Sequence, residues 1–141
     1  MNKILLLTLL FGLFLVNSCK DDPATPGPDY HVHFVSPNAD VKHIGETINI
    51  KVDFEDHNGG TVHHINVKMY SQLNPNNVIF DMPTEPHVHE TSGFYEFNEN
   101  FTLDGAIIPP HTDWVIKASV WGHDDGVAEV SDSLSFHVMP Q

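Results

Sequence analysis

The sequence predicts an all-β fold, and three observations lead to that prediction. From residue 30 onward apolar and polar residues alternate with period two, and no stretch shows the 3.6-residue period of an amphipathic helix. Turn-forming combinations such as Asn58-Gly59-Gly60 and Pro109-Pro110 separate the alternating segments. About seven such segments fit into about 110 residues, an ordinary length for one domain with one core. Residues 30–141 are therefore expected to form a single immunoglobulin-like β-sandwich of about seven strands.

In each expected strand, apolar residues occupy every second position and so share the face that packs into the core. The expected strands, with their core-facing residues, are 30–35 (Val32, Phe34), 46–54 (Ile48, Ile50, Val52, Phe54), 62–70 (Ile65, Val67, Met69), 77–82 (Val78, Phe80), 93–103 (Tyr95, Phe97, Phe101, Leu103), 112–121 (Trp114, Ile116, Ala118, Val120) and 129–138 (Leu134, Phe136, Val138).

The N-terminus is typical of a secreted lipoprotein. Lys3 precedes an apolar run from Ile4 to Val16, which is short compared with the roughly 20 residues that span a bilayer as a helix. The sequence Val16-Asn17-Ser18-Cys19 resembles a lipobox, and Cys19 is the only cysteine in the chain. We expect residues 1–18 to be a cleaved signal peptide and Cys19 to be the lipidated (palmitoylated) N-terminus. Residues 19–29, rich in proline, are expected to be a tether. The alternative is an ordinary signal peptide with an incidental cysteine.

A family resemblance extends this interpretation. Residues 114–138, an alternating strand, then Asp124-Asp125-Gly126, then another alternating strand, resemble the end of cadherin-like and PKD-like domains. The acidic Lys20-Asp21-Asp22 resembles the surface-export signal of Bacteroidota lipoproteins. Together these features are similar to small immunoglobulin-like lipoproteins of Bacteroidota. The resemblance implies a lipid-anchored outer-membrane protein, and leaves open whether the domain faces the cell surface and whether it contacts other envelope proteins or glycans.

The charge of the chain limits its partners. The formal net charge is −13, with 19 acidic residues and no arginine. Nucleic acid is excluded as an expected partner, because binding requires lysine or arginine to neutralise phosphates. An acidic surface instead raises the local concentration of cations.

Histidine is abundant, with 11 residues. In an immunoglobulin-like sandwich the loops that follow residues 54, 82 and 121 meet the start of the first strand at one pole. That pole collects the candidate metal ligands His31, His33, His57, His63, His64, His87, His89 and His123, whereas His43, His111 and His137 fall at the opposite end. Secondary candidates at the same pole are Glu55, Asp56, Glu90, Asp124 and Asp125. Imidazole with carboxylate suits Zn²⁺ or Cu²⁺, and the acids are expected to raise the histidine pKa values.

Other interpretations remain open at this point. The histidines could be solvated strand faces, and the carboxylates alone could suit calcium, although their spacing matches no known calcium loop. No nucleophile motif or metalloprotease helix is present and nothing positions Glu90 as a base, so we expect a non-catalytic protein. Trp121 lies out of phase with the core residues of its strand and should face outward. A surface module that binds glycan or protein, without a metal role, is therefore the alternative function.

Overall fold

The computed structural model describes residues 26–124 and 126–141. The expected signal peptide, Cys19, most of the tether and Asp125 lie outside these residues, so the expectations for them stay predictions. The described part of the chain contains strands and no helix, and therefore no helix that could cross a membrane. The strands are β1 (Tyr30–Ser36), β2 (Lys42–His43), β3 (Thr47–Asp56), β4 (Val62–Ser71), β5 (Val78–Met82), β6 (His87–Glu90), β7 (Phe94–Thr102), β8 (Thr112–Trp121) and β9 (Val130–Met139).

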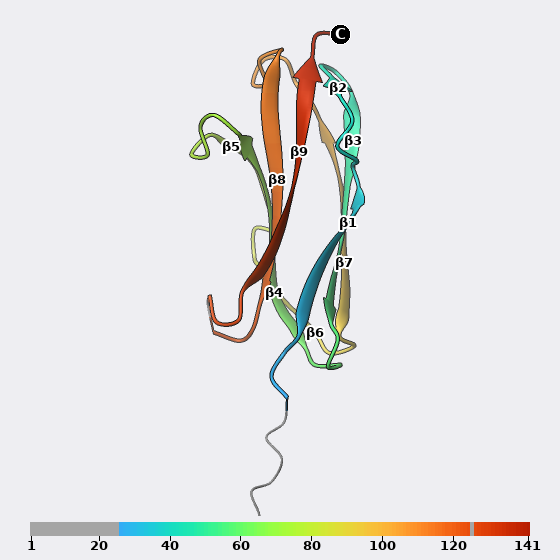
Figure 1. Ribbon diagram of the computed structural model, residues 1–141, viewed down its shortest axis with the longest axis vertical. Helices are drawn as coiled ribbons and strands as arrows, with labels where there is room; N and C mark the ends of the chain where they lie inside the picture. Colours follow the sequence, from blue (N-terminus) through green and yellow to red (C-terminus); the bar gives the residue numbers. More distant parts are fainter. Residues whose placement is uncertain (1–25, 125) are drawn as a thin grey trace, which may run out of the picture.

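The strands form two sheets that face each other (Figure 1). The smaller sheet has the order β1-β3-β7 and is antiparallel. The larger sheet has the order β2-β9-β8-β4-β5, and β6 also pairs with β4. The short strand β2 is parallel to β9, whereas the other pairs in this sheet are antiparallel. The predicted all-β sandwich is confirmed.

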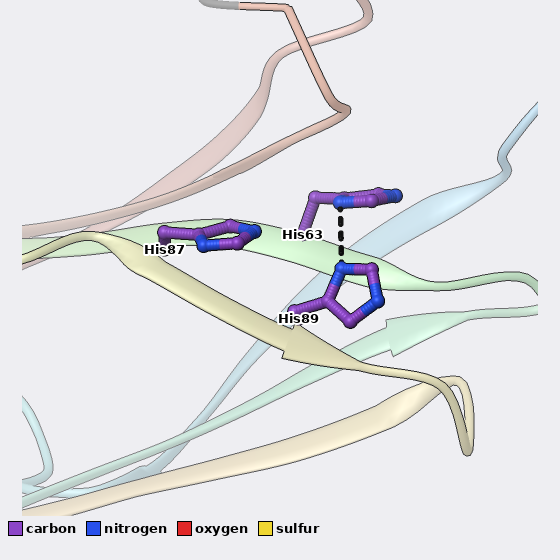
Figure 2. Close-up of side chains that lie close together, drawn as sticks. All are labelled: His63, His87 and His89. Atoms are coloured by element: carbon purple, nitrogen blue, oxygen red, sulfur yellow. Dashed lines mark hydrogen bonds between the residues drawn. The ribbon is translucent and has the colours of Figure 1, made fainter.

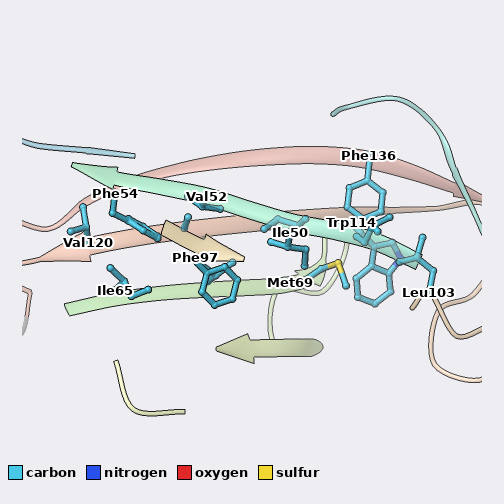
Figure 3. Close-up of a cluster of buried hydrophobic side chains, with 14 of the residues drawn as sticks. Ile50, Val52, Phe54, Ile65, Met69, Phe97, Leu103, Trp114, Val120 and Phe136 are labelled. Carbon is cyan, nitrogen blue, oxygen red and sulfur yellow. The ribbon is translucent and has the colours of Figure 1, made fainter. Parts of the chain in front are cut away.

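The core lies between the two sheets (Figure 3). It is built from the alternating residues of β3, β4 and β8, as the period-two pattern requires. Trp114 on β8 is the largest fully buried side chain, and its indole N–H donates to Thr112 Oγ1 at 2.9 Å. Burying the indole therefore leaves no unsatisfied donor. In the described part of the chain, all nine strands and the buried core cluster lie within residues 30–139, as expected of a domain with its own core.

Two details of the strand prediction were wrong. The structure has β2 and β6 in addition to the seven expected strands, and β6 occupies residues 87–90, where a loop was expected. The segment after β4 runs back along the edge of β4 as two short strands, β5 and β6, which the prolines at 83 and 86 separate because proline has no N–H for the ladder. Val78 is 42% exposed rather than core-facing, because β5 is an edge strand that pairs only with β4.

Candidate metal centre

Three imidazoles come together on the outer side of β4 and β6. Each of the three residues His63, His87 and His89 has a ring nitrogen that lies within 4.8 Å of a ring nitrogen of the other two. His63 Nδ1 and His89 Nδ1 are 3.4 Å apart and share a hydrogen bond (Figure 2). Four ligands bonded to zinc at about 2.0–2.1 Å in a tetrahedron have their nitrogens about 3.4 Å apart. We call these three residues the His63 cluster.

A β-bulge turns His89 towards His63. In the pairing of β4 with β6, Val62 is opposite Glu90 and His64 is opposite His87, so β6 contains one extra residue across this interval. His89 lies within it and has a φ of 49°, a left-handed conformation that histidine adopts more readily than most residues. Bulges redirect side chains in this way, often beside functional sites. His87 and His89 are both exposed, whereas Val88 between them packs against the core.

Two further histidines border the His63 cluster. The ring of His123, from the loop between β8 and β9, has its centroid 5.4 Å from that of His63. The ring of His64 lies 4.9 Å from that of His87, and its Nδ1 donates to the carbonyl of Gly122 at 2.7 Å. With Nδ1 protonated, Nε2 of His64 carries the free lone pair, which is the arrangement that metal-binding histidines usually have. Both rings are therefore neighbours of the His63 cluster without being part of it.

The electrostatics of the His63 cluster differ from the sequence-based expectation. The pKa of His63 lies below its ordinary value of 6.5, because partial burial disfavours the charged ring and because four neighbouring imidazoles repel a positive charge. The expectation that acids would raise the pKa was therefore wrong for His63. The rings of His89, His123, His64 and His87 surround it, in that order of effect, and no carboxylate contributes. A neutral His63 keeps its lone pair available to a metal.

A second group forms where the tether enters β1. A carboxylate oxygen of Asp29, a ring nitrogen of His31 and a ring nitrogen of His57 all lie within 4.8 Å of one another. The rings of His31 and His57 stack with centroids 3.8 Å apart, and Glu55 Oε2 is 3.0 Å from His57 Nε2. We call Asp29, His31 and His57 the Asp29 cluster. The sequence-based analysis missed Asp29, although its position two residues before His31 in an extended segment places both side chains on one face.

The remaining candidates belong to neither cluster. His33 is exposed on β1, opposite Asp53. Asp56 is buried and its Oδ1 accepts hydrogen bonds from two backbone N–H groups, and Glu90 Oε1 accepts one from Ser92. Asp124 is exposed, and Asp125 lies outside the described residues. The three histidines that were expected at the opposite end belong to neither cluster. The His137 ring hydrogen-bonds to Asp113 and lies 6.4 Å from the His111 ring. His43 is on β2.

The outer face of the larger sheet also carries an open groove of about 680 Å³. Trp121 lines it, together with Asn66, Asp81, Lys68 and Lys117, among others. Trp121 is only partly buried, which confirms that it faces away from the core. The groove therefore combines an indole with amide, carboxylate and ammonium groups.

Comparison with known proteins identifies the fold. No protein-family model and no curated protein matches the chain. The solution structure of the CARDB domain of a Pyrococcus furiosus protein aligns with a TM-score of 0.51 and 15% identity, over 79% of this chain and 95% of that one. The crystal structure of Spo0M, a sporulation control protein of Bacillus subtilis, aligns with a TM-score of 0.52 and 14% identity, over 82% of this chain and 51% of that one.

A crystal structure of the same Pyrococcus furiosus domain, in complex with di-metal ions, aligns with a lower TM-score of 0.45 and 14% identity, over 79% of this chain and 94% of that one. At these identities the likeness concerns the fold and not the site. The described chain has a CARDB-like β-sandwich fold.

Proposed function

We propose that this protein is a lipid-anchored, non-catalytic protein of the bacterial outer membrane whose sandwich domain binds Zn²⁺ or Cu²⁺ through the His63 cluster. The observation that carries the proposal is the convergence of His63, His87 and His89 within 4.8 Å. Neutral imidazole binds both ions well, and the fourth position would be taken by His123, His64 or water. The anchor and the location rest on the lipobox-like sequence that ends at Cys19 and on the resemblance to Bacteroidota lipoproteins.

The bulge supports a binding role for these side chains. His89 takes a left-handed backbone conformation that costs a non-glycine residue free energy, on the order of 1 kcal/mol or more. The two Nδ1 atoms of His63 and His89 face each other, so one must keep its proton to make their hydrogen bond. A metal ion would replace that proton and bind both lone pairs.

The chemistry of Glu90 supports the proposal that the protein binds a metal without catalysing a reaction. Glu90 directly follows His89 in the sequence and is the candidate general base beside the His63 cluster. The backbone hydrogen bond from Ser92, followed by the Ser92 side chain, lowers the pKa of Glu90 below its ordinary value. A carboxylate with a lowered pKa is a weaker base, which makes it a poor group for activating water.

The test uses residues 20–141, which contain all nine strands and the whole core, produced without a histidine tag. Zn²⁺ binding by calorimetry should be far tighter than Mg²⁺ binding, because nitrogen ligands disfavour the harder ion. The double variant His87→Ala/His89→Asn should raise the Kd for Zn²⁺ at the His63 cluster at least about a hundredfold, since even loss of a partner that only orients a ligand costs about 10–100-fold. Asparagine at 89 tolerates the left-handed conformation, so the bulge is kept.

The matched control is His33→Ala/His43→Ala, which removes two exposed imidazoles outside both clusters and should leave the Kd unchanged. Equal losses in the two double variants would mean diffuse coordination by scattered imidazoles, and the proposal would fail.

The groove favours a second candidate function, the capture of a glycan on the outer face of the larger sheet. Trp121 offers an aromatic surface and Asn66 and Asp81, which hydrogen-bond each other at 2.8 Å, offer polar groups for hydroxyls. A glycan array with the wild-type domain and with Trp121→Ala tests it. Binding that Trp121→Ala abolishes and His87→Ala/His89→Asn preserves would support the glycan role, and an array without hits would reject it.

A further inference from the structure

The Asp29 cluster differs in chemistry from the His63 cluster. It contains two imidazoles and the carboxylate of Asp29, and Glu55 brings a second carboxylate to His57 (3.0 Å between Oε2 and Nε2). Asp29 Oδ1 lies 3.4 Å from His31 Nε2. Two carboxylates beside two imidazoles offer both negative charge and nitrogen ligands to a divalent cation.

The rings of His31 and His57 lie next to each other. The ring centroids of His31 and His57 are 3.8 Å apart and their planes are 14° from parallel. The lone pair of an imidazole nitrogen lies in the plane of its ring, so one of the two rings has to tilt before both lone pairs point at one ion. Both side chains are about half exposed, which leaves room for that rotation.

Hydrogen bonds hold the backbone segments that carry Asp29 and His57 in place before any ion binds. The N–H of Asp29 donates to Asp56 Oδ1 at 3.0 Å, and the carbonyl of Asp29 accepts from the N–H of His57 at 2.9 Å. Asp56 is buried, and the same Oδ1 atom also accepts from the N–H of Asn58 at 3.0 Å. The first residue before β1 is therefore fixed to the turn that follows β3, and the segments that carry Asp29 and His57 have a defined separation. Preorganisation of this kind lowers the cost of binding.

We propose that the Asp29 cluster is a second transition-metal site, separate from the His63 cluster, in which Asp29, His31, His57 and Glu55 bind one divalent ion such as Zn²⁺ or Cu²⁺ through two nitrogens and two oxygens. An ion at this place joins the end of the tether to the β3–β4 turn. The two sites share no ligand, so they fill independently and can be removed one at a time.

The test is the zinc stoichiometry of four proteins, each comprising residues 20–141 without a tag, measured by calorimetry and by metal analysis after dialysis. Wild type should bind two Zn²⁺ ions. The variant Asp29→Asn/His57→Ala should lose one ion, His87→Ala/His89→Asn should lose the other, and the combined variant should retain none. Asp29→Asn keeps the backbone bonds of residue 29, and the half-exposed His57 side chain contacts Glu55 and His31 at the surface, so the sandwich should stay folded. Circular dichroism checks this.

A second readout identifies the ligands. In the His87→Ala/His89→Asn background, Cu²⁺ should give a paramagnetic resonance signal with coupling to two imidazoles, and His31→Ala should reduce it to one. The inference is overturned if the Asp29→Asn/His57→Ala variant binds zinc with the stoichiometry and affinity of wild type. If the His63 cluster binds no zinc, the inference is still supported when wild type binds one ion and Asp29→Asn/His57→Ala binds none. Failure of the first site and failure of the second are thus distinguishable.

Discussion

The imidazole of His64 stacks on the indole of Trp121, with ring centroids 5.3 Å apart and planes 7° from parallel. The same imidazole lies 4.9 Å from the ring of His87. Trp121 is thus two ring contacts away from the His63 cluster. The other tryptophan, Trp114, lies seven residues earlier on β8, about 23 Å away along the strand, and is buried in the core.

This relationship predicts that copper will quench one tryptophan selectively. Cu²⁺ at the His63 cluster should quench the fluorescence of wild type and of Trp114→Phe strongly, and that of Trp121→Phe weakly, because quenching falls steeply with distance. The measurement is a fluorescence titration with up to one equivalent of Cu²⁺, made in the Asp29→Asn/His57→Ala background so that the second proposed site takes up no copper. In the His87→Ala/His89→Asn variant the selective quenching should disappear. Similar quenching of both single-tryptophan proteins would place the copper elsewhere.

The lowered pKa of His63 predicts how the stability of the metal-free domain depends on pH. Because the pKa of His63 in the folded state lies below the ordinary 6.5, the unfolded chain binds its proton more readily than the folded chain does. The free energy that the lowered pKa of His63 contributes to folding is fully present above pH 6.5. It is lost as the pH falls through 6.5 towards the pKa of the folded state. The urea midpoint of wild type, measured with a chelator present, should therefore fall with acidification in this range.

The variant His63→Gln, which does not titrate there, should show a weaker fall in the midpoint, and His33→Gln should behave like wild type. The lowered pKa has a second consequence, since each ligating ring must lose its proton before it binds. For His63 this condition is met at a lower pH than for a histidine with the ordinary pKa, and zinc binding at the His63 cluster should weaken as the pH falls. A midpoint that rises on acidification, with His63→Gln no different from wild type, would contradict the sign of the shift.

Trp114 anchors the core, and its loss should be among the most damaging single substitutions. The side chain is 1% exposed and its N–H is satisfied by Thr112. Trp114→Ala should lower the free energy of unfolding by about 3–5 kcal/mol, as truncation of large buried aromatic side chains does. Urea denaturation followed by circular dichroism measures it. Leu73→Ala, at a side chain that is 90% exposed, is the control and should change stability by less than about 0.5 kcal/mol.

The lipid anchor gives a prediction outside the described residues. If Cys19 is the lipidated N-terminus, Cys19→Ala should abolish incorporation of labelled fatty acid and leave the signal peptide uncleaved by the lipoprotein peptidase. Fatty-acid labelling of the full chain, with Ser18→Ala as a control next to the cleavage point, tests this. Labelled fatty acid in the Cys19→Ala protein would exclude the anchor.

The alternation of apolar residues was sufficient to predict the sandwich, because one buried face per strand is a local property of the sequence. Ile50, Val52 and Phe54 lie in the core as expected. The pattern could not predict β6, whose four residues His87–Glu90 pair with β4 only because the chain after β5 returns along the same edge. That return depends on the register of β4 and β5 and is not encoded in the local pattern.

The site was predicted less completely than the fold. The expected topology was sufficient to predict that eight histidines lie at one pole. It could not predict that some of them separate into two clusters, because that separation depends on which sheet each strand joins. His31 and His57 belong to the smaller sheet and its turn, whereas His63 and His89 belong to the larger one. The bulge that turns His89 towards His63 also has no signal in the sequence, because the residue there is not the glycine that a left-handed position usually carries.

Gly60 connects the stability of the domain to the Asp29 cluster. A Cβ atom at this position would lie 2.3 Å from Asp56 Oδ2, which is far inside van der Waals contact. The Asp56 side chain would have to move, and its Oδ1 would then lose the N–H groups of Asp29 and Asn58. Gly60→Ala should therefore cost about 1–3 kcal/mol of stability, the typical penalty for leaving buried hydrogen-bonding groups unpaired.

The same substitution should act on the two proposed metal sites unequally. Once Asp29 loses its bond to Asp56, only the bond from the N–H of His57 to its carbonyl still holds it in place. Zinc should then bind the Asp29 cluster about tenfold more weakly, the lower end of the loss seen when an orienting partner is removed. The affinity of the His63 cluster should not change, because its three rings stand on β4 and β6 and make no contact with Asp56. Gly27→Ala is the control, since a Cβ there meets no atom within 4 Å. Calorimetry on both variants decides the matter: an unchanged Asp29 cluster in Gly60→Ala would show that Asp56 does not position it.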